Sequence, residues 1–169
     1  MTEAPLDESL NPIWTLLSRG GPPNLWMRPT GDEAWEPSLA AAAASVDDGE
    51  LIVSVARPLA RSVLARITGR GALSTKGPAP GEIEAALNWH GLEMVATYDL
   101  WPSARSPRIA FPRGRFHMLY WLQTSGVLGG GGNRLWARAM ARSVAFTPVA
   151  AVLSPGIAYV VRRPLGAPR

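Results

Sequence analysis

The chain has 169 residues, a length that suits one domain with a hydrophobic core and short tails. It contains no cysteine and two histidines, so disulfides, thiolate metal sites and thiol nucleophiles are excluded and a histidine-based metal site is not expected. The first fifty residues hold nine acidic residues and two arginines, whereas the remainder holds fifteen basic and four acidic residues, with no acidic residue after Asp99.

Residues 1–24 predict an acidic, proline-broken, extended lead segment. Its apolar island, "IWTLL", includes Trp14 and Leu17, which we expect to dock on a surface. The segment has neither the basic start nor the apolar run of a signal peptide, so the protein is expected to stay in the cytoplasm. The next run, "LWM" at 25–27, lies between prolines, which predicts a short strand at a sheet edge, where proline is tolerated.

The following segments alternate between helix and strand. The alanine run in "EPSLAAAAASVDDG" predicts a helix that ends at a turn, and the β-branched "ELIVSVARP" predicts a strand buried on both faces. Apolar residues at helical spacing predict a helix over 58–70, and a second helix is expected over 82–90, capped by Gly91. The alternating run "LEMVATYDLWP" predicts a strand that ends at Pro102. This order indicates an α/β sheet with parallel neighbours.

The pattern loosens after Pro102. Residues 103–150 are expected to form a basic, glycine-rich insertion with a helix over 134–146, and "GIAYVVRRP" predicts a last strand at 157–162, before a tail at 164–169. Two uncharged stretches in this region are divided by glycine and proline residues. We therefore favour contact with a membrane surface over a membrane span.

The glycine run in "SGVLGGGGNRLW" does not match a nucleotide-binding loop. A dinucleotide fingerprint needs a third glycine where this sequence has Arg134, and a phosphate-binding loop needs lysine where it has Gly132. Histidine catalysis is not expected either, because no acidic residue near His117 orients its imidazole and His90 stands at a predicted helix end. The glycines predict a flexible joint, with Asn133 as the N-cap of the next helix.

Residues 25–163 resemble the C-terminal half of a class I S-adenosylmethionine-dependent methyltransferase domain. In this resemblance "LWM" is the fourth strand, "GELIVSVARP" the fifth, "HGLEMVATYDLWP" the sixth with the helix before it, and "GIAYVVRRP" the final antiparallel strand. The segment "SPRIAFPRG" is similar to one that lipid- and sugar-cluster methyltransferase-like proteins carry between their last two strands. The resemblance implies a partial Rossmann-like α/β sheet of about four strands, three parallel and one antiparallel, with the basic insertion between the last two.

The resemblance leaves out the half of the methyltransferase domain that binds the cofactor. That half has a glycine-rich turn after its first strand and an acidic residue at the end of its second. The 24 residues before the predicted fourth strand are too few for three strands with their helices. No cofactor-binding residue of the family can be assigned to this sequence, so we expect neither a cofactor nor a catalytic residue.

Basic and aromatic residues form the candidate binding surface. Arg134, Arg138 and Arg142 recur at every fourth position, which predicts one stripe along a helix. The stripe favours contact with anionic lipid or an acidic protein, and its alternative is a solvated helix face beside a core stripe. The candidate partner-binding or membrane-surface residues are Trp14, Leu17, Trp26, Arg105, Arg108, Arg113, Arg115, Trp121, Arg134, Trp136, Arg138 and Arg142.

These observations predict a protein that is not an enzyme. We expect a truncated methyltransferase-like domain that serves as an accessory or structural subunit, binds other protein subunits, and lies at the cytoplasmic face of a membrane complex of photosynthetic or respiratory type. One alternative is an S-adenosylmethionine-dependent methyltransferase or the partner half of one. Another alternative is a protein that binds anionic lipid or nucleic acid; nucleic acid is the less favoured ligand, because the first fifty residues are acidic and no recognition motif is present.

Overall fold

A computed structural model describes residues 11–18, 24–27, 34–46, 49–57, 78–101, 103–114, 116–117, 119–120 and 154–164. The helices are α1 (Pro12–Leu17), α2 (Trp35–Ala44) and α4 (Pro80–Trp89), and the strands are β1 (Asn24–Met27), β2 (Glu50–Ala56), β3 (Glu93–Trp101), β4 (Ile109–Pro112) and β5 (Gly156–Arg162). The predicted helices at 58–70 and 134–146 and the glycine run lie outside the described residues.

The strands form one open sheet in the order β1-β2-β5-β3-β4. Strands β1 and β2 pair in parallel, whereas β5 is antiparallel to both of its neighbours, β2 and β3, and β4 is antiparallel to β3. The α/β class is therefore confirmed, but the sheet has five strands instead of about four. Among the described strands one pair of neighbours is parallel, because the last strand inserts between β2 and β3 instead of adding to an edge.

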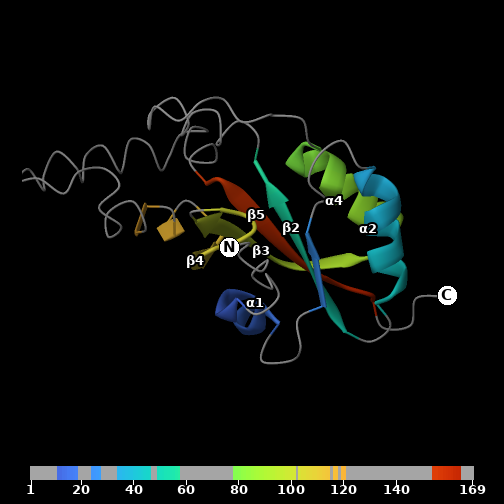
Figure 1. Cartoon of the computed structure of the whole chain (residues 1–169), viewed down its shortest axis with the longest axis horizontal. Helices are drawn as coiled ribbons and strands as arrows, with labels where there is room; N and C mark the ends of the chain where they lie inside the picture. The colour runs from blue at the N-terminus through green and yellow to red at the C-terminus, as the bar shows by residue number, and fades with distance from the viewer. Residues whose placement is uncertain are drawn as a thin grey trace, which may run out of the picture.

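Helices cover both faces of the sheet (Figure 1). Helices α2 and α4 pack on one face, over a core that includes Leu39, Leu87 and Tyr159. Helix α1 lies on the other face, where fully buried Trp14 packs in a second core with Ile52. The lead segment thus differs from the expected extended chain, since residues 12–17 form a helix that belongs to the fold.

Strands β2 and β5 are buried on both faces. All residues from Leu51 to Val55 are buried, and so are Gly156 to Val161, with alternate side chains directed into the two cores. The prediction of a two-sided buried strand at "ELIVSVARP" is confirmed. The unbroken alternation predicted for β3 is wrong, because a register shift between Met94 and Ala96 brings Val95 and Ala96 to the same core.

Local hydrogen bonds fix the ends of α4. The Ala79 amide donates to the Glu82 carboxylate at 2.7 Å, which satisfies a main-chain donor at the helix start. At the other end Gly91 has a φ of 69°, and the Leu92 amide donates to the Leu87 carbonyl at 3.1 Å. The expected glycine cap is confirmed, because this left-handed conformation favours glycine.

No helix in the described ranges is long and apolar enough to cross a membrane.

Candidate functional site

Strands β1, β2 and β3 run in the same direction, so their carboxyl ends lie side by side at one end of the sheet. We call this end of the strands the carboxyl edge. At the amino ends of the strands, Glu50 of β2 and Glu93 of β3 both pair with Arg162, so the two strands begin at the same level. In open α/β sheets, ligands bind outside the carboxyl ends of the strands. The residues that follow β2 and end β3 therefore define the first candidate site.

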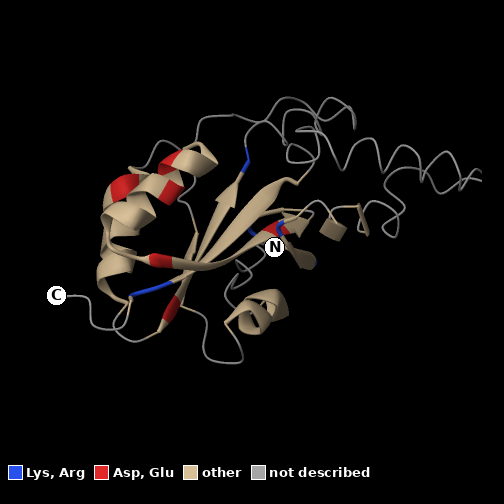
Figure 2. Cartoon of the chain, turned by 180° about the vertical axis from the view of Figure 1, so that it is seen from behind, with Lys and Arg blue, Asp and Glu red and all other residues tan. Residues whose placement is uncertain are grey.

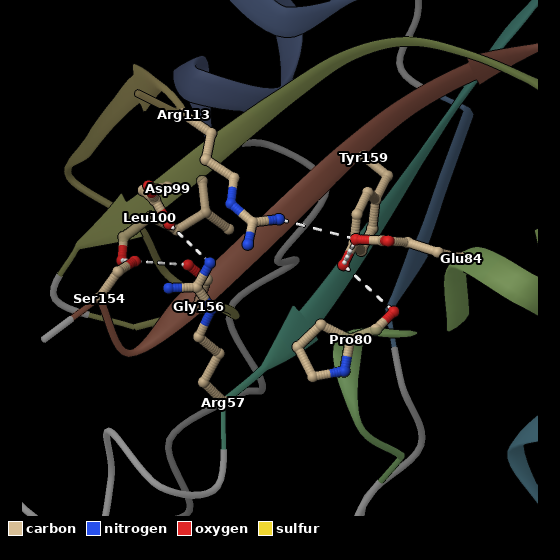
Figure 3. A network of polar contacts seen from close by, with 9 residues as sticks. All are labelled: Arg57, Pro80, Glu84, Asp99, Leu100, Arg113, Ser154, Gly156 and Tyr159. Carbon is tan, nitrogen blue, oxygen red and sulfur yellow. Dashed lines mark hydrogen bonds and ion pairs between the residues drawn. The ribbon is translucent and has the colours of Figure 1, made fainter. Parts of the chain in front are cut away.

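A buried ion pair stands at this edge. Arg57 directly follows β2, and its Nη2 atom lies 2.9 Å from Oδ1 of Asp99 in β3, with both side chains less than 8% exposed (7% and 4%). The pair spans the start of β5, where the Arg57 amide also donates to the Pro155 carbonyl at 3.0 Å. Figure 3 shows the guanidinium directed at the carboxylate. The ion pair thus joins the ends of three neighbouring strands.

Burial opposes charge on both partners. Desolvation lowers the pKa of Arg57 and raises the pKa of Asp99, and the attraction of each group for the other opposes both shifts. The guanidinium remains protonated throughout the physiological range, so Asp99 always has a cation beside it. The pair is held at a desolvation cost, and removal of one partner would leave a buried charge without compensation.

A second polar group ties α4 to the sheet. The Tyr159 hydroxyl of β5 donates to Oε1 of Glu84 in α4 at 3.0 Å, and Nη1 of Arg113 lies 3.6 Å from the same Oε1 atom (Figure 3). Burial and then the nearby Glu84 carboxylate raise the pKa of Tyr159 well above its ordinary value. The phenol therefore stays protonated and acts as a donor.

The polar groups of this site contact one another. The Ser154 hydroxyl donates to the Gly156 carbonyl at 2.7 Å. The described residues contain no group of three histidine, aspartate or glutamate side chains that could hold a metal. With each charge matched by a partner of opposite sign, the arrangement suits a brace between strands and helix.

The sequence-predicted binding residues fall at different places. Trp14 and Trp26 are buried in the two cores, so their rings are not accessible in this conformation, and Leu17 packs partly buried beside Trp14. Arg113 is directed at Glu84, while Arg105 is half-buried and Arg108 is exposed in the segment before β4. The remaining predicted residues lie outside the described ranges: Arg115, Trp121, Arg134, Trp136, Arg138 and Arg142.

The polar network consists of Arg57, Asp99, Tyr159, Glu84 and Arg113, and sequence reasoning predicted a binding role for Arg113 alone. Arg57 and Asp99 each stand in an apolar strand context, "VARP" and "YDLW". Two single charges of opposite sign, each at the carboxyl end of a predicted strand, are a signal for a buried pair. Tyr159 and Glu84 gave no such signal, because a tyrosine in a strand and a glutamate in the N-terminal half of a helix are ordinary.

Strand β1 is a second feature with functional potential. Within the described part of the chain, β1 pairs with β2 alone, so its outer main-chain groups face no strand. The faces of β1 are nevertheless engaged: the Trp26 indole donates to the Ser38 hydroxyl of α2 at 2.9 Å, and Leu25 and Met27 pack into the α1 core. Both faces of the strand are thus packed, while no described strand pairs with its outer edge.

No family model, curated protein or solved structure matches the chain.

Proposed function

We propose that the chain is a non-catalytic accessory subunit that binds a larger protein assembly through the open edge of its sheet at β1. The observation that carries this proposal is a parallel edge strand, packed on both faces, with no described strand on its outer side. Parallel strands usually lie inside α/β sheets, and an exposed strand edge is a template for another chain. A strand of the partner would complete the sheet by main-chain hydrogen bonds.

The strand order supports the proposed origin of this edge. The resemblance implies a final strand that is antiparallel to the others, and here β5 is antiparallel to both β2 and β3, which run in one direction. In this proposal β1, β2, β3 and β5 correspond to the fourth, fifth, sixth and last strands of that domain. The first strand of the intact domain pairs with the fourth, so in this proposal a strand of the partner pairs with β1 in the same way.

The proposed assembly lies at the cytoplasmic face of a membrane, as in photosynthetic or respiratory complexes. The support is the charge of the chain, since every charged residue after Asp99 is basic and all but Lys76 of the basic residues are arginine. Arginine forms bidentate contacts with phosphate and carboxylate groups, which anionic lipids and acidic subunits both present.

The same strand order favours a second function, in which the chain is one half of a split methyltransferase and a separate chain carries the cofactor site. Titration calorimetry with S-adenosylmethionine distinguishes these functions. The accessory-subunit proposal predicts no heat of binding for the lone protein and none for its complex with the partner. Saturable binding by the complex alone would favour the split enzyme.

Purification of the native protein in mild detergent tests the proposed function. The proposal predicts that the chain elutes in a complex of fixed stoichiometry with at least one other protein. A monomer that elutes alone from gently lysed cells and binds S-adenosylmethionine would contradict it.

A further inference from the structure

A groove lies between α2 and α4, on the helical face of the sheet. It has a volume of about 790 Å³, within the range of about 300–1,000 Å³ that is typical of ligand sites. Its aromatic and charged lining residues come from three places. These are the start of α2 (Trp35 and Glu36), the start of α4 (Glu82), and the end of α4 with its C-cap (Trp89 and His90). None of these side chains takes part in the polar network at the carboxyl edge.

The groove is acidic in a basic protein. The chain carries a net charge of +4, yet the charged residues of α2 and α4 are all glutamates, as Figure 2 shows. Glu36 is exposed and has no hydrogen bond or ion pair with any described residue. Glu82 accepts the Ala79 amide through Oε2, which leaves its Oε1 atom outside this cap. The groove therefore favours a cation.

The aromatic residues of the groove indicate which kind of cation fits. Trp89 is 88% exposed, although a tryptophan side chain is usually buried. An exposed indole is the strongest aromatic partner for a cation, and a guanidinium stacks on its face more readily than an ammonium does. A guanidinium is also weakly hydrated and forms paired hydrogen bonds with carboxylates.

We propose that the α2–α4 groove binds an arginine-bearing segment of a partner protein. One guanidinium stacks on Trp89 and pairs with Glu36, while the apolar floor of Ala40 and Ala86 receives the aliphatic part of the segment. A peptide is favoured over a small cation because the groove runs along two helices and is open to solvent at Trp89. This assignment rests on the proposed function only in placing a partner on the protein, and it uses a surface different from the β1 edge.

Fluorescence anisotropy with a labelled, capped hexa-arginine peptide tests the assignment on the full-length protein. The net positive charge of the chain disfavours non-specific capture of this peptide, so saturable binding is informative. The expected result is saturable binding that weakens with added salt. Trp89→Ala and Glu36→Gln should each raise the Kd about five- to tenfold. Both residues are partly or fully exposed, so the variants should fold, as far-ultraviolet circular dichroism would verify.

Two variants serve as matched controls. Glu93→Gln removes an exposed carboxylate whose only described partner is exposed Arg162, and Leu16→Ala removes a large exposed side chain on the opposite face of the sheet. Both should leave the Kd unchanged within about twofold, because neither residue lines the groove.

Several outcomes would overturn the assignment. Absence of saturable binding would do so, as would equal binding by the wild type and the Trp89→Ala variant. A hexa-lysine peptide that binds as tightly as hexa-arginine would show that the groove recognises positive charge without preference for a guanidinium. Tetramethylammonium that binds with the same affinity as hexa-arginine would show that the groove is a site for small cations. Dimer formation that Trp89→Ala abolishes would assign the groove to a second copy of the chain. None of these results bears on the open β1 edge, so the proposed function can survive the failure of this inference.

Discussion

Arg57 and Asp99 are the residues whose loss should damage the fold most at the carboxyl edge. Asp99→Ala leaves the guanidinium buried and without its carboxylate, which costs about 3–5 kcal/mol of unfolding free energy. The double variant Arg57→Met/Asp99→Leu removes both charges and should recover most of that loss. Urea unfolding of the three proteins measures these differences. A single variant as stable as the wild type would show that the ion pair does not brace the strands.

Tyr159 makes the stability of the protein dependent on alkaline pH. Its folded-state pKa is raised, whereas in the unfolded chain the phenol loses its proton near pH 10, so above about pH 10 the folded state binds more protons than the unfolded state. The contribution of Tyr159 is therefore complete below that pH and decreases as the pH rises further. Tyr159→Phe should cost about 0.5–1.5 kcal/mol at pH 7, because the hydrogen bond to Glu84 is lost.

The pH dependence of this variant separates the pKa shift from the simple loss of a hydrogen bond. From pH 9 to 11 the free energy of unfolding should fall less in Tyr159→Phe than in the wild type. Chemical unfolding at a series of pH values measures both slopes. Parallel slopes would mean that Tyr159 titrates alike in the folded and unfolded states, contrary to its buried place against Glu84.

At the scale of elements, the sequence predicted those whose patterns are local. The buried strand β2, the edge strand β1, helix α4 with its Gly91 cap and strand β5 all follow from residue type and periodicity within about ten residues. Helix α1 was missed because six residues have little intrinsic helical stability, and α1 depends on the burial of Trp14 against the sheet. Strand β4 was missed because its short, arginine-flanked sequence gains strand structure only by pairing with β3.

Close packing at the start of β5 gives a prediction for one glycine. A Cβ atom at Gly156 would lie 2.7 Å from both Cα and Cβ of Ala104, a contact that only a main-chain shift can relieve. Gly156→Ala should therefore cost about 1–3 kcal/mol of unfolding free energy.

Gly81 in α4 provides the matched control for this substitution. A Cβ atom at Gly81 would meet nothing within 4 Å, so Gly81→Ala should stabilise the protein by about 0.5–1 kcal/mol through the unfolded chain. Thermal or urea unfolding compares the two variants. If Gly156→Ala were as stable as Gly81→Ala, the packing of the 103–108 segment against β5 would be wrong.

At the scale of the whole molecule, the strand order was the part that sequence patterns did not supply. A buried apolar run such as "GIAYVVR" predicts a strand but not the strands beside it. The same pattern fits a strand near the edge of the sheet and one at its centre. The polar network was hidden for the same reason, because Glu84, Asp99 and Tyr159 meet only after β5 has inserted beside β3. Residue patterns predicted the order of β1, α2, β2, α4, β3 and β5 along the chain, whereas the resemblance to a methyltransferase half remains a proposal.

The outer edge of β1 and the α2–α4 groove, which we propose as partner-binding surfaces, differ in their chemistry. The edge offers main-chain groups and is indifferent to sequence, whereas the groove selects charge through Glu36 and Trp89. A partner that binds both surfaces would gain affinity from the β1 edge and specificity from the α2–α4 groove. The two surfaces are separable by experiment, since groove variants leave the main chain of β1 intact.

Amide hydrogen exchange of β1 tests the central claim most directly. It is measured by nuclear magnetic resonance on the isolated chain and by mass spectrometry on the native complex. In the isolated chain, we expect the outward-facing amides among residues 24–27 to exchange much faster than those of Leu51–Val55 in β2, which are paired on both sides. In the native complex, the same β1 amides should become protected. Full protection of β1 in the isolated chain, equal to that of β2, would contradict the proposal that a partner completes this sheet.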